Sequence, residues 1–147
     1  MKLSKYAIVA VLLFSAFTAT ETAAKRKMVP EIYMFGFSAS FNDSTVYFTN
    51  VQNVDSAWVE TKDKFLLGRD NYSYQLKNYL ADKLNLPNRT CVVIFGMTRK
   101  EAEKKYLKMK RLYTIKAKGM YDVKYIDTKD FRFRHIDMSI EESEGSK

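Results

Sequence analysis

The sequence predicts an α+β fold, a small two-layer sandwich in which two helices cover one face of a mostly antiparallel sheet, as a variant of the ferredoxin-like arrangement. Three observations lead to this prediction. Alternating residues flank a turn at Asn42 and Asp43, which indicates a hairpin. Two segments, 70–84 and 98–115, carry apolar residues at the helical repeat. Between them, the unbroken apolar run 91–95 is typical of a central strand.

The predicted hairpin has aromatic residues on one face and hydroxyl-bearing residues on the other. Its register sets Phe37 opposite Phe48 and Ser38 opposite Tyr47. Antiparallel sheets commonly have one buried and one solvated face. We therefore expect the aromatic face to be buried and the hydroxyl-rich face to be wet. A short strand over 56–60 extends the meander.

Helical periodicity and capping signals define the two predicted helices. The first is expected to take Asp70 or Asn71 as its N-cap. The second begins with a capping box, in which the Thr98 hydroxyl accepts from the amide of Glu101 and the Glu101 carboxylate reaches back. We expect the second helix to face the sheet with one apolar stripe, made of Ala102, Tyr106, Met109 and Tyr113.

Two more strands are expected after the second helix, at 121–126 and 131–136. In the second of them, alternation places Phe131, Phe133 and His135 on one face. The helix between the strands at 91–95 and 121–126 indicates a crossover connection.

The first 24 residues have the pattern of a secretory signal peptide. Lys2 and Lys5 precede an apolar run at 7–17, and small residues lead up to Ala24. A membrane span needs about 20 apolar residues, so this run is short for an anchor. We expect cleavage after Ala24, with an uncleaved anchor or a buried N-terminal helix as the alternative.

Cleavage would leave a single domain over 25–138 and a polar, acidic, disordered tail over 139–147. The mature chain would contain no transmembrane segment, and we expect it to be secreted or periplasmic.

The composition excludes several classes of site. One cysteine and one histidine exclude an intrachain disulfide scaffold, a cysteine-rich metal centre and any site that needs two imidazoles. The aspartates at 127, 130 and 137 follow no recognised calcium loop. We find no catalytic signature and expect neither a metal nor a cofactor. Cys91 is interpreted as a buried apolar residue. The alternative function is a small hydrolase or thiol enzyme that uses Cys91 or His135.

Positive charge is concentrated in the second helix and its exit. The segment from Thr98 to Lys118 holds nine basic and two acidic residues, a net of +7 out of +8 for the whole chain. Four of the basic residues lie opposite the apolar stripe and are the candidate binding residues: Lys100, Lys104, Lys108 and Arg111. A merely solvated lysine face is the alternative interpretation.

Such a face attracts anionic partners through long-range electrostatics. We therefore predict a noncatalytic envelope or extracellular binding module. Its partner would be an anionic glycan, a cell-wall polymer, an acidic membrane surface or a protein. Nucleic acid is a poor candidate, because stacking aromatic residues are not interleaved with the lysines. The sequence leaves the oligomeric state open.

Several segments of the chain resemble an uncharacterised family of small exported bacterial proteins, namely 35–50, 55–59, 74–84, 89–95 and 104–114. This resemblance implies export and one domain, and it attaches no activity to any residue. The segment 92–106, in which a strand passes through a glycine-containing turn into a helix, is similar to half of a peptidoglycan-binding SPOR domain. That second resemblance implies a binding module.

Overall fold

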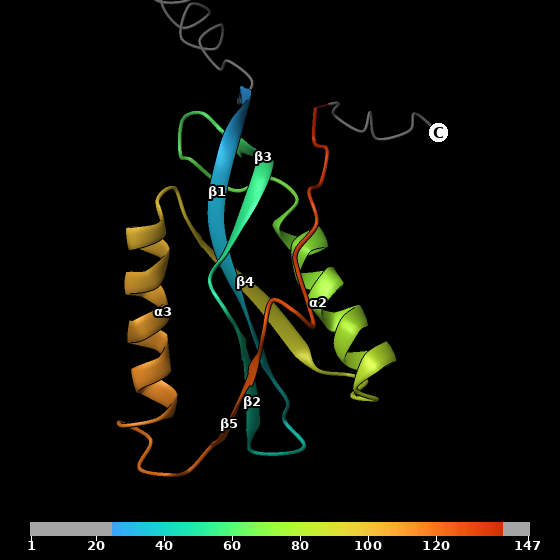
Figure 1. Ribbon diagram of the computed structural model, residues 1–147, viewed down its shortest axis with the longest axis vertical. Helices are drawn as coiled ribbons and strands as arrows, with labels where there is room; N and C mark the ends of the chain where they lie inside the picture. Colours follow the sequence, from blue (N-terminus) through green and yellow to red (C-terminus); the bar gives the residue numbers. More distant parts are fainter. Residues whose placement is uncertain (1–24, 140–147) are drawn as a thin grey trace, which may run out of the picture.

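The computed structural model describes residues 25–139 as a five-stranded sheet with two helices (Figure 1). The α+β class and the mostly antiparallel sheet are confirmed. The predicted signal peptide, 1–24, and residues 140–147 of the predicted tail lie outside the described residues. The elements are, in chain order, β1 (Arg26–Ala39), β2 (Thr45–Thr49), β3 (Gln52–Glu60), α2 (Arg69–Lys83), β4 (Thr90–Gly96), α3 (Arg99–Tyr113) and β5 (Asp122–Ile126).

β1 is the centre of the sheet, because three other strands pair with it. β4 runs antiparallel along one side of β1, and β2 and β3 run antiparallel along the other. The pairs Phe37–Phe48 and Ser38–Tyr47 have the predicted register. The β1–β2 pairing ends near Phe37–Phe48, and the β1–β3 pairing begins at Met34–Gln52. Between these two pairs, the chain that runs from β2 to β3 contains one residue more than β1. The extra residue forms a β-bulge around 50–51, where such an insertion bends a strand.

β5 completes the sheet by pairing with β2 in parallel, with Val123 opposite Val46. Since β2 and β4 are both antiparallel to β1, β4 and β5 run in the same direction, with β1 and β2 between them. α3 connects these two parallel strands. The strand expected at 121–126 and the helical crossover that leads into it are both confirmed.

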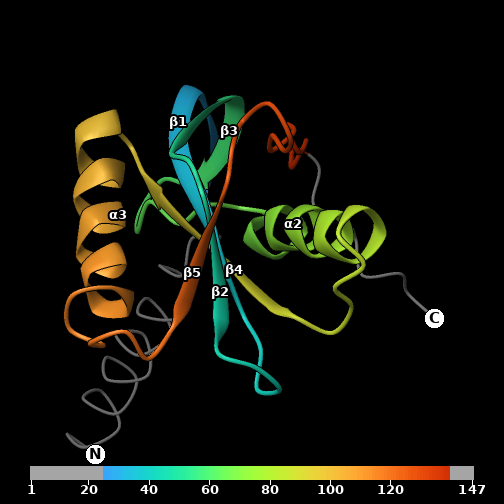
Figure 2. The same ribbon diagram turned by 60° about the horizontal axis from the view of Figure 1, so that its bottom comes forward.

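The two helices lie on opposite faces of the sheet, which corrects the prediction that both cover one face (Figures 1 and 2). Leu76 of α2 shares a buried cluster with Met34 of β1, whereas Tyr106 of α3 packs against a second cluster that contains Phe35. Successive residues of a strand point to opposite faces. Because both sets of β1 side chains are large and apolar here, each face requires a helix to cover it.

Two glycines position α2. A Cβ on Gly36 would lie 2.5 Å from Cδ2 of Leu76, so the absence of a side chain lets the helix approach β1. At the start of α2, the N-cap position is occupied by Gly68, with a φ of 72°, and no side chain caps the helix. The predicted caps, Asp70 and Asn71, are wrong because both residues lie inside the first turn. Glycine adopts this left-handed conformation at little cost.

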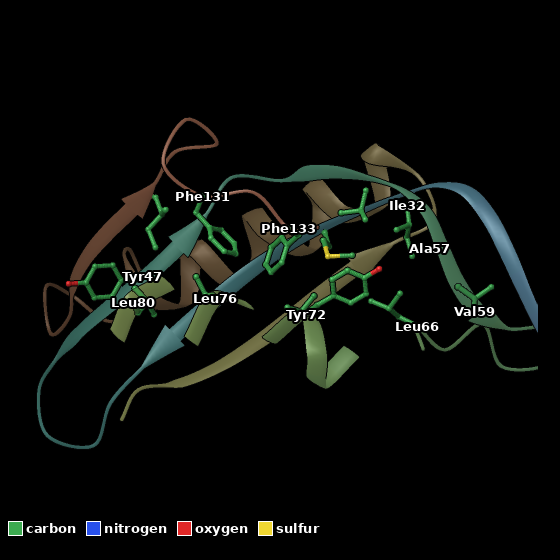
Figure 3. Close-up of a cluster of buried hydrophobic side chains, with 14 residues drawn as sticks. Ile32, Tyr47, Ala57, Val59, Leu66, Tyr72, Leu76, Leu80, Phe131 and Phe133 are labelled. Carbon is green, nitrogen blue, oxygen red and sulfur yellow. The ribbon is translucent and has the colours of Figure 1, made fainter. Parts of the chain in front are cut away.

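The hydroxyl-rich face of the hairpin is buried, not wet. Ser38 and Thr49 are almost fully buried, and Thr49 Oγ1 accepts a hydrogen bond of 2.8 Å from the N–H of Gly36. α2 and the segment that carries Phe131 and Phe133 cover this face (Figure 3). The prediction of a solvated face is wrong, because the residues that cover it come from distant parts of the chain.

The segment 131–136 is predicted as a strand, and the structure contains no strand there. Its backbone is instead bound by the side-chain amides of two glutamines. Gln52 donates to the carbonyl of Phe131 and accepts from the N–H of Phe133, both at 2.9 Å. Gln75 donates to the carbonyl of Arg134 at 3.0 Å and accepts from the N–H of the same residue at 2.7 Å. These bonds satisfy backbone groups that a neighbouring strand would otherwise pair with.

Candidate functional site

α3 carries the predicted binding residues, and local sequence determines where it begins. The N–H of Glu101 donates to Oγ1 of Thr98 at 3.2 Å, as the capping box predicts. The Glu101 carboxylate reaches back one residue further than predicted and accepts from the N–H of Met97 at 3.2 Å. The first bond satisfies one of the amide groups that a helix N-terminus leaves unpaired, and the second holds the residue that precedes the N-cap.

The predicted apolar stripe of α3 anchors the helix to the sheet. Ala102 is fully buried, and three other members of the stripe pack against the aromatic face of the hairpin: Tyr106, Met109 and Tyr113. The rings of Tyr106 and Phe35 meet edge-on, with their centres 5.2 Å apart, and the centres of the Tyr113 and Phe37 rings are 4.7 Å apart. This packing fixes which face of α3 points outward.

Three basic residues of α3 bind to the protein itself. Arg99 lies 3.7 Å from the Glu103 carboxylate and 5.0 Å from the centre of the Tyr33 ring. Lys105 donates to the carbonyl of Phe95 at 2.8 Å, and Lys110 lies 5.1 Å from the centre of the Tyr125 ring. These three cations therefore have structural roles.

The four predicted binding residues lie outward instead. Lys100, Lys104, Lys108 and Arg111 are all exposed. Within residues 25–139, their side chains have no ion pair, hydrogen bond or ring contact with another residue. Three of them line one hollow of about 510 Å³ together with an aliphatic and a further basic residue; the lining is Lys104, Leu107, Lys108, Arg111 and Lys116. We call these five residues and Lys100 the basic surface.

The charges on the basic surface are arranged unfavourably for the helix itself. Lys100, Lys104 and Lys108 follow one another at intervals of four, and like charges at this spacing destabilise a helix by about 0.2–0.5 kcal/mol per pair. Lys100 also lies in the first turn, where the helix dipole disfavours a cation. Only Arg111, in the last turn, has a position that the dipole favours. Helix stability therefore does not explain this row of lysines.

Cys91 is half-buried and lies in a separate groove between α2 and β4, of about 590 Å³, whose lining includes Arg69, Lys77 and Arg89. Burial raises the pKa of the Cys91 thiol, and a hydrogen bond with Ser38 and nearby positive charges offset part of this shift. A raised pKa keeps the sulfur in the neutral form at neutral pH, whereas a nucleophile requires the thiolate.

His135 does not join Cys91. It is exposed, does not line the groove, and is not among the residues between 25 and 139 that act on the thiol. Its imidazole lies close enough to Asp137 to help lower the pKa of that carboxyl, which a hydrogen bond with Ser139 lowers most. The described residues therefore do not bring the two candidate catalytic residues together.

The state of Cys91 can be tested with an alkylating reagent. At pH 7.5 we expect iodoacetamide to modify the native thiol several-fold more slowly than the thiol of the urea-unfolded chain, because burial raises its pKa. At a pH above the ordinary thiol pKa, the thiol of the unfolded chain is already ionised and its rate no longer rises. The native thiol, with its raised pKa, still gains thiolate as the pH increases. The ratio of the two rates should therefore narrow as the pH rises. A native thiol that reacts as fast as the unfolded one at pH 7.5 would support the enzyme alternative.

The aspartates do not form a metal centre. Asp127 accepts a hydrogen bond of 3.0 Å from the N–H of Lys129, which lowers the pKa of its carboxyl and closes a turn. Between residues 25 and 139, no group of three histidine, cysteine, aspartate or glutamate side chains could hold a metal ion.

No helix within residues 25–139 is long and apolar enough to cross a bilayer.

No family model, curated protein or solved structure matches this chain. The resemblances to small exported bacterial proteins and to half of a SPOR domain therefore stay predictions. The function must accordingly be inferred from the geometry of the chain's own residues.

Sequence reasoning missed two features of these sites. Leu107 is 57% exposed in the middle of the basic surface, although its helical position already places it among lysines and away from the apolar stripe. Arg89 is almost fully buried beside the hairpin turn and forms an ion pair with Asp43. No local pattern indicates that contact, because 46 positions separate the two residues.

Proposed function

We propose that this protein is an exported, noncatalytic binding module that holds an anionic partner on the basic surface of α3. Export is supported by the signal-like pattern of residues 1–24. The binding role is supported by one observation above all. The cations of α3 divide into three that bind to the protein itself and a row of four that have no partner within residues 25–139.

The row of outward-facing cations on α3 favours an anionic polymer or an anionic surface over a small anion. Lys100, Lys104 and Lys108 extend along the helix at a rise of about 1.5 Å per residue, so the row spans roughly 12 Å. Four basic side chains line the hollow beside the row together with Leu107. An extended array of this kind attracts polyanions by long-range electrostatics and contacts several anionic groups at once.

Charge reversal tests this proposal. We expect the triple variant Lys104→Glu, Lys108→Glu and Arg111→Glu to bind dextran sulfate at least about a hundredfold more weakly than the native chain, because each cation near an anionic surface contributes about 1 kcal/mol. Affinity is measured by titration at low ionic strength. Unchanged affinity would overturn the proposal.

A matched control separates the basic surface from net charge. The variant Lys27→Glu, Lys62→Glu and Lys77→Glu changes the total charge by the same amount, at exposed positions outside α3. We expect it to bind nearly as tightly as the native chain. In the first variant the Lys104→Glu change replaces a repulsive pair with Lys100, four residues earlier, by an attractive one. The changes at Lys108 and Arg111 leave like charges at neighbouring positions and place an anion in the last turn, so helix content is measured as the check on folding. Circular dichroism should show unchanged helix content.

A further inference from the structure

Exposed apolar side chains occur together with the cations of the basic surface. Leu107 lies within the surface and is 57% exposed. Ile115 and Met120, which follow the end of α3, are 72% and 69% exposed. Isolated exposed apolar residues are common on proteins. Leu112 of α3 is also exposed, by 47%. Several such residues beside one positive surface are a feature that a purely ionic binding site does not require.

The chain after α3 is folded so that these residues stay near the helix end. The N–H of Lys116 donates to the carbonyl of Arg111 at 3.0 Å, and the N–H of Met120 donates to the carbonyl of Ala117 at the same distance. These bonds close successive turns directly after the helix. Lys116 returns to the hollow as a result, so the helix and its exit form one continuous surface.

This surface faces away from the rest of the fold. α3 and the loop that follows it lie on one side of the sheet, and no other described element lies outside them in either view (Figures 1 and 2). The main apolar stripe of α3 is occupied by the sheet. A partner would therefore meet the cations together with Leu107 and Ile115, and not the aromatic face of the helix.

We propose that the partner is a phospholipid bilayer with acidic headgroups. This inference rests on the proposed function and names the partner. The lysines and Arg111 bind headgroup phosphates, and Leu107, Ile115 and Met120 enter the boundary between headgroups and acyl chains. Basic residues combined with exposed apolar residues are the composition of helices that lie in a membrane interface. A hydrated glycan or wall polymer has no apolar phase to receive those three side chains.

The test compares two probes and two variants of the full chain. The probes are vesicles of phosphatidylglycerol with phosphatidylcholine, and dextran sulfate in solution. Pure phosphatidylcholine vesicles measure binding that needs no acidic headgroup, including any binding through the apolar N-terminal run 7–17, and the ratio of anionic to neutral vesicle binding measures the contribution of the headgroup charge. The test variant changes Leu107, Ile115 and Met120 to Ser. The control changes three apolar residues that are exposed elsewhere, Met28, Phe41 and Phe65, to Ser.

We expect the test variant to lose at least about tenfold in affinity for the anionic vesicles while its affinity for dextran sulfate stays unchanged, because only the bilayer receives apolar side chains. The control should match the native chain on both probes. A test variant that keeps the native affinity for the anionic vesicles would overturn the bilayer proposal. A native chain that binds dextran sulfate and shows a vesicle ratio of one would also overturn it, and would leave the proposed function standing. Binding to neither probe would overturn both.

Discussion

Replacing Arg89 with Ala is expected to lower the free energy of unfolding by about 1–3 kcal/mol, the cost of leaving a buried polar group without its hydrogen-bond partner. Only 3% of the Arg89 side chain is exposed. Its guanidinium donates to Oγ of Ser38 at 3.1 Å, to the Asp43 carboxylate at 3.1 Å and to the carbonyl of Thr45. It also lies 4.9 Å from the centre of the Tyr47 ring. The single side chain therefore ties the start of β4 to the hairpin turn.

The expected cost comes mainly from the groups that Arg89 would leave behind. Ser38 is fully buried, and an unsatisfied buried polar group costs about 1–3 kcal/mol. Asp43 is about half exposed, so water can hydrate its carboxylate after the substitution. Urea unfolding followed by circular dichroism measures the loss. Arg134→Ala is the control, because that side chain is exposed and should change stability by less than about 0.5 kcal/mol. A loss of similar size in both variants would contradict the role of Arg89.

Replacing Gly96 with Val is expected to lower the free energy of unfolding by about 3 kcal/mol, at the upper end of the usual penalty for overpacking. A Cβ at Gly96 would lie 2.6 Å from the backbone nitrogen of Ala102 and 3.1 Å from its Cα. Both atoms belong to the backbone of α3, so no side-chain rotation relieves the clash. The helix that carries the basic surface would have to move away from β4.

Two further variants distinguish this mechanism from a general intolerance of glycine replacement. Ala102→Gly should not rescue Gly96→Val, because the contact is with backbone atoms. Gly36→Ala should cost less, because its nearest neighbour at 2.5 Å is the end of the Leu76 side chain, which can rotate. Thermal unfolding with near-ultraviolet circular dichroism reports both stability and the aromatic packing under α3. Rescue by Ala102→Gly would contradict the proposed contact.

Local patterns were sufficient to predict much of this fold. The alternating residues on either side of Asn42–Asp43 predicted the hairpin register correctly, although the strands stop at Ala39 and Thr45 and residues 40–44 form the loop between them. The capping box at Thr98 marked the start of α3, since capping involves only neighbouring residues. The helical repeat also separated the buried stripe of α3 from its exposed lysines correctly.

One error is local, the N-cap of α2, which is Gly68. The other errors concern contacts between distant parts of the chain. Alternation along β1 shows that Met34 and Phe35 point to opposite faces, but it does not say which helix covers which face. The segment with Phe131 and Phe133 has the alternation of a strand, yet its backbone is bound by glutamine side chains that come from β3 and α2. The exposed positions of the four candidate binding residues could be predicted because they lie on one helix. The ionic contact of Arg89 could not, because the fold creates it.

The salt dependence of binding tests the central claim most directly. The logarithm of the affinity for dextran sulfate should fall linearly with the logarithm of the salt concentration, with a slope that counts the cations in contact. Reversal of Lys104, Lys108 and Arg111 should reduce the magnitude of that slope by about three, one for each contact removed. Reversal of Lys27, Lys62 and Lys77 should leave it unchanged. Equal slopes for the native chain and the α3 variant would contradict the claim that the basic surface binds the anion.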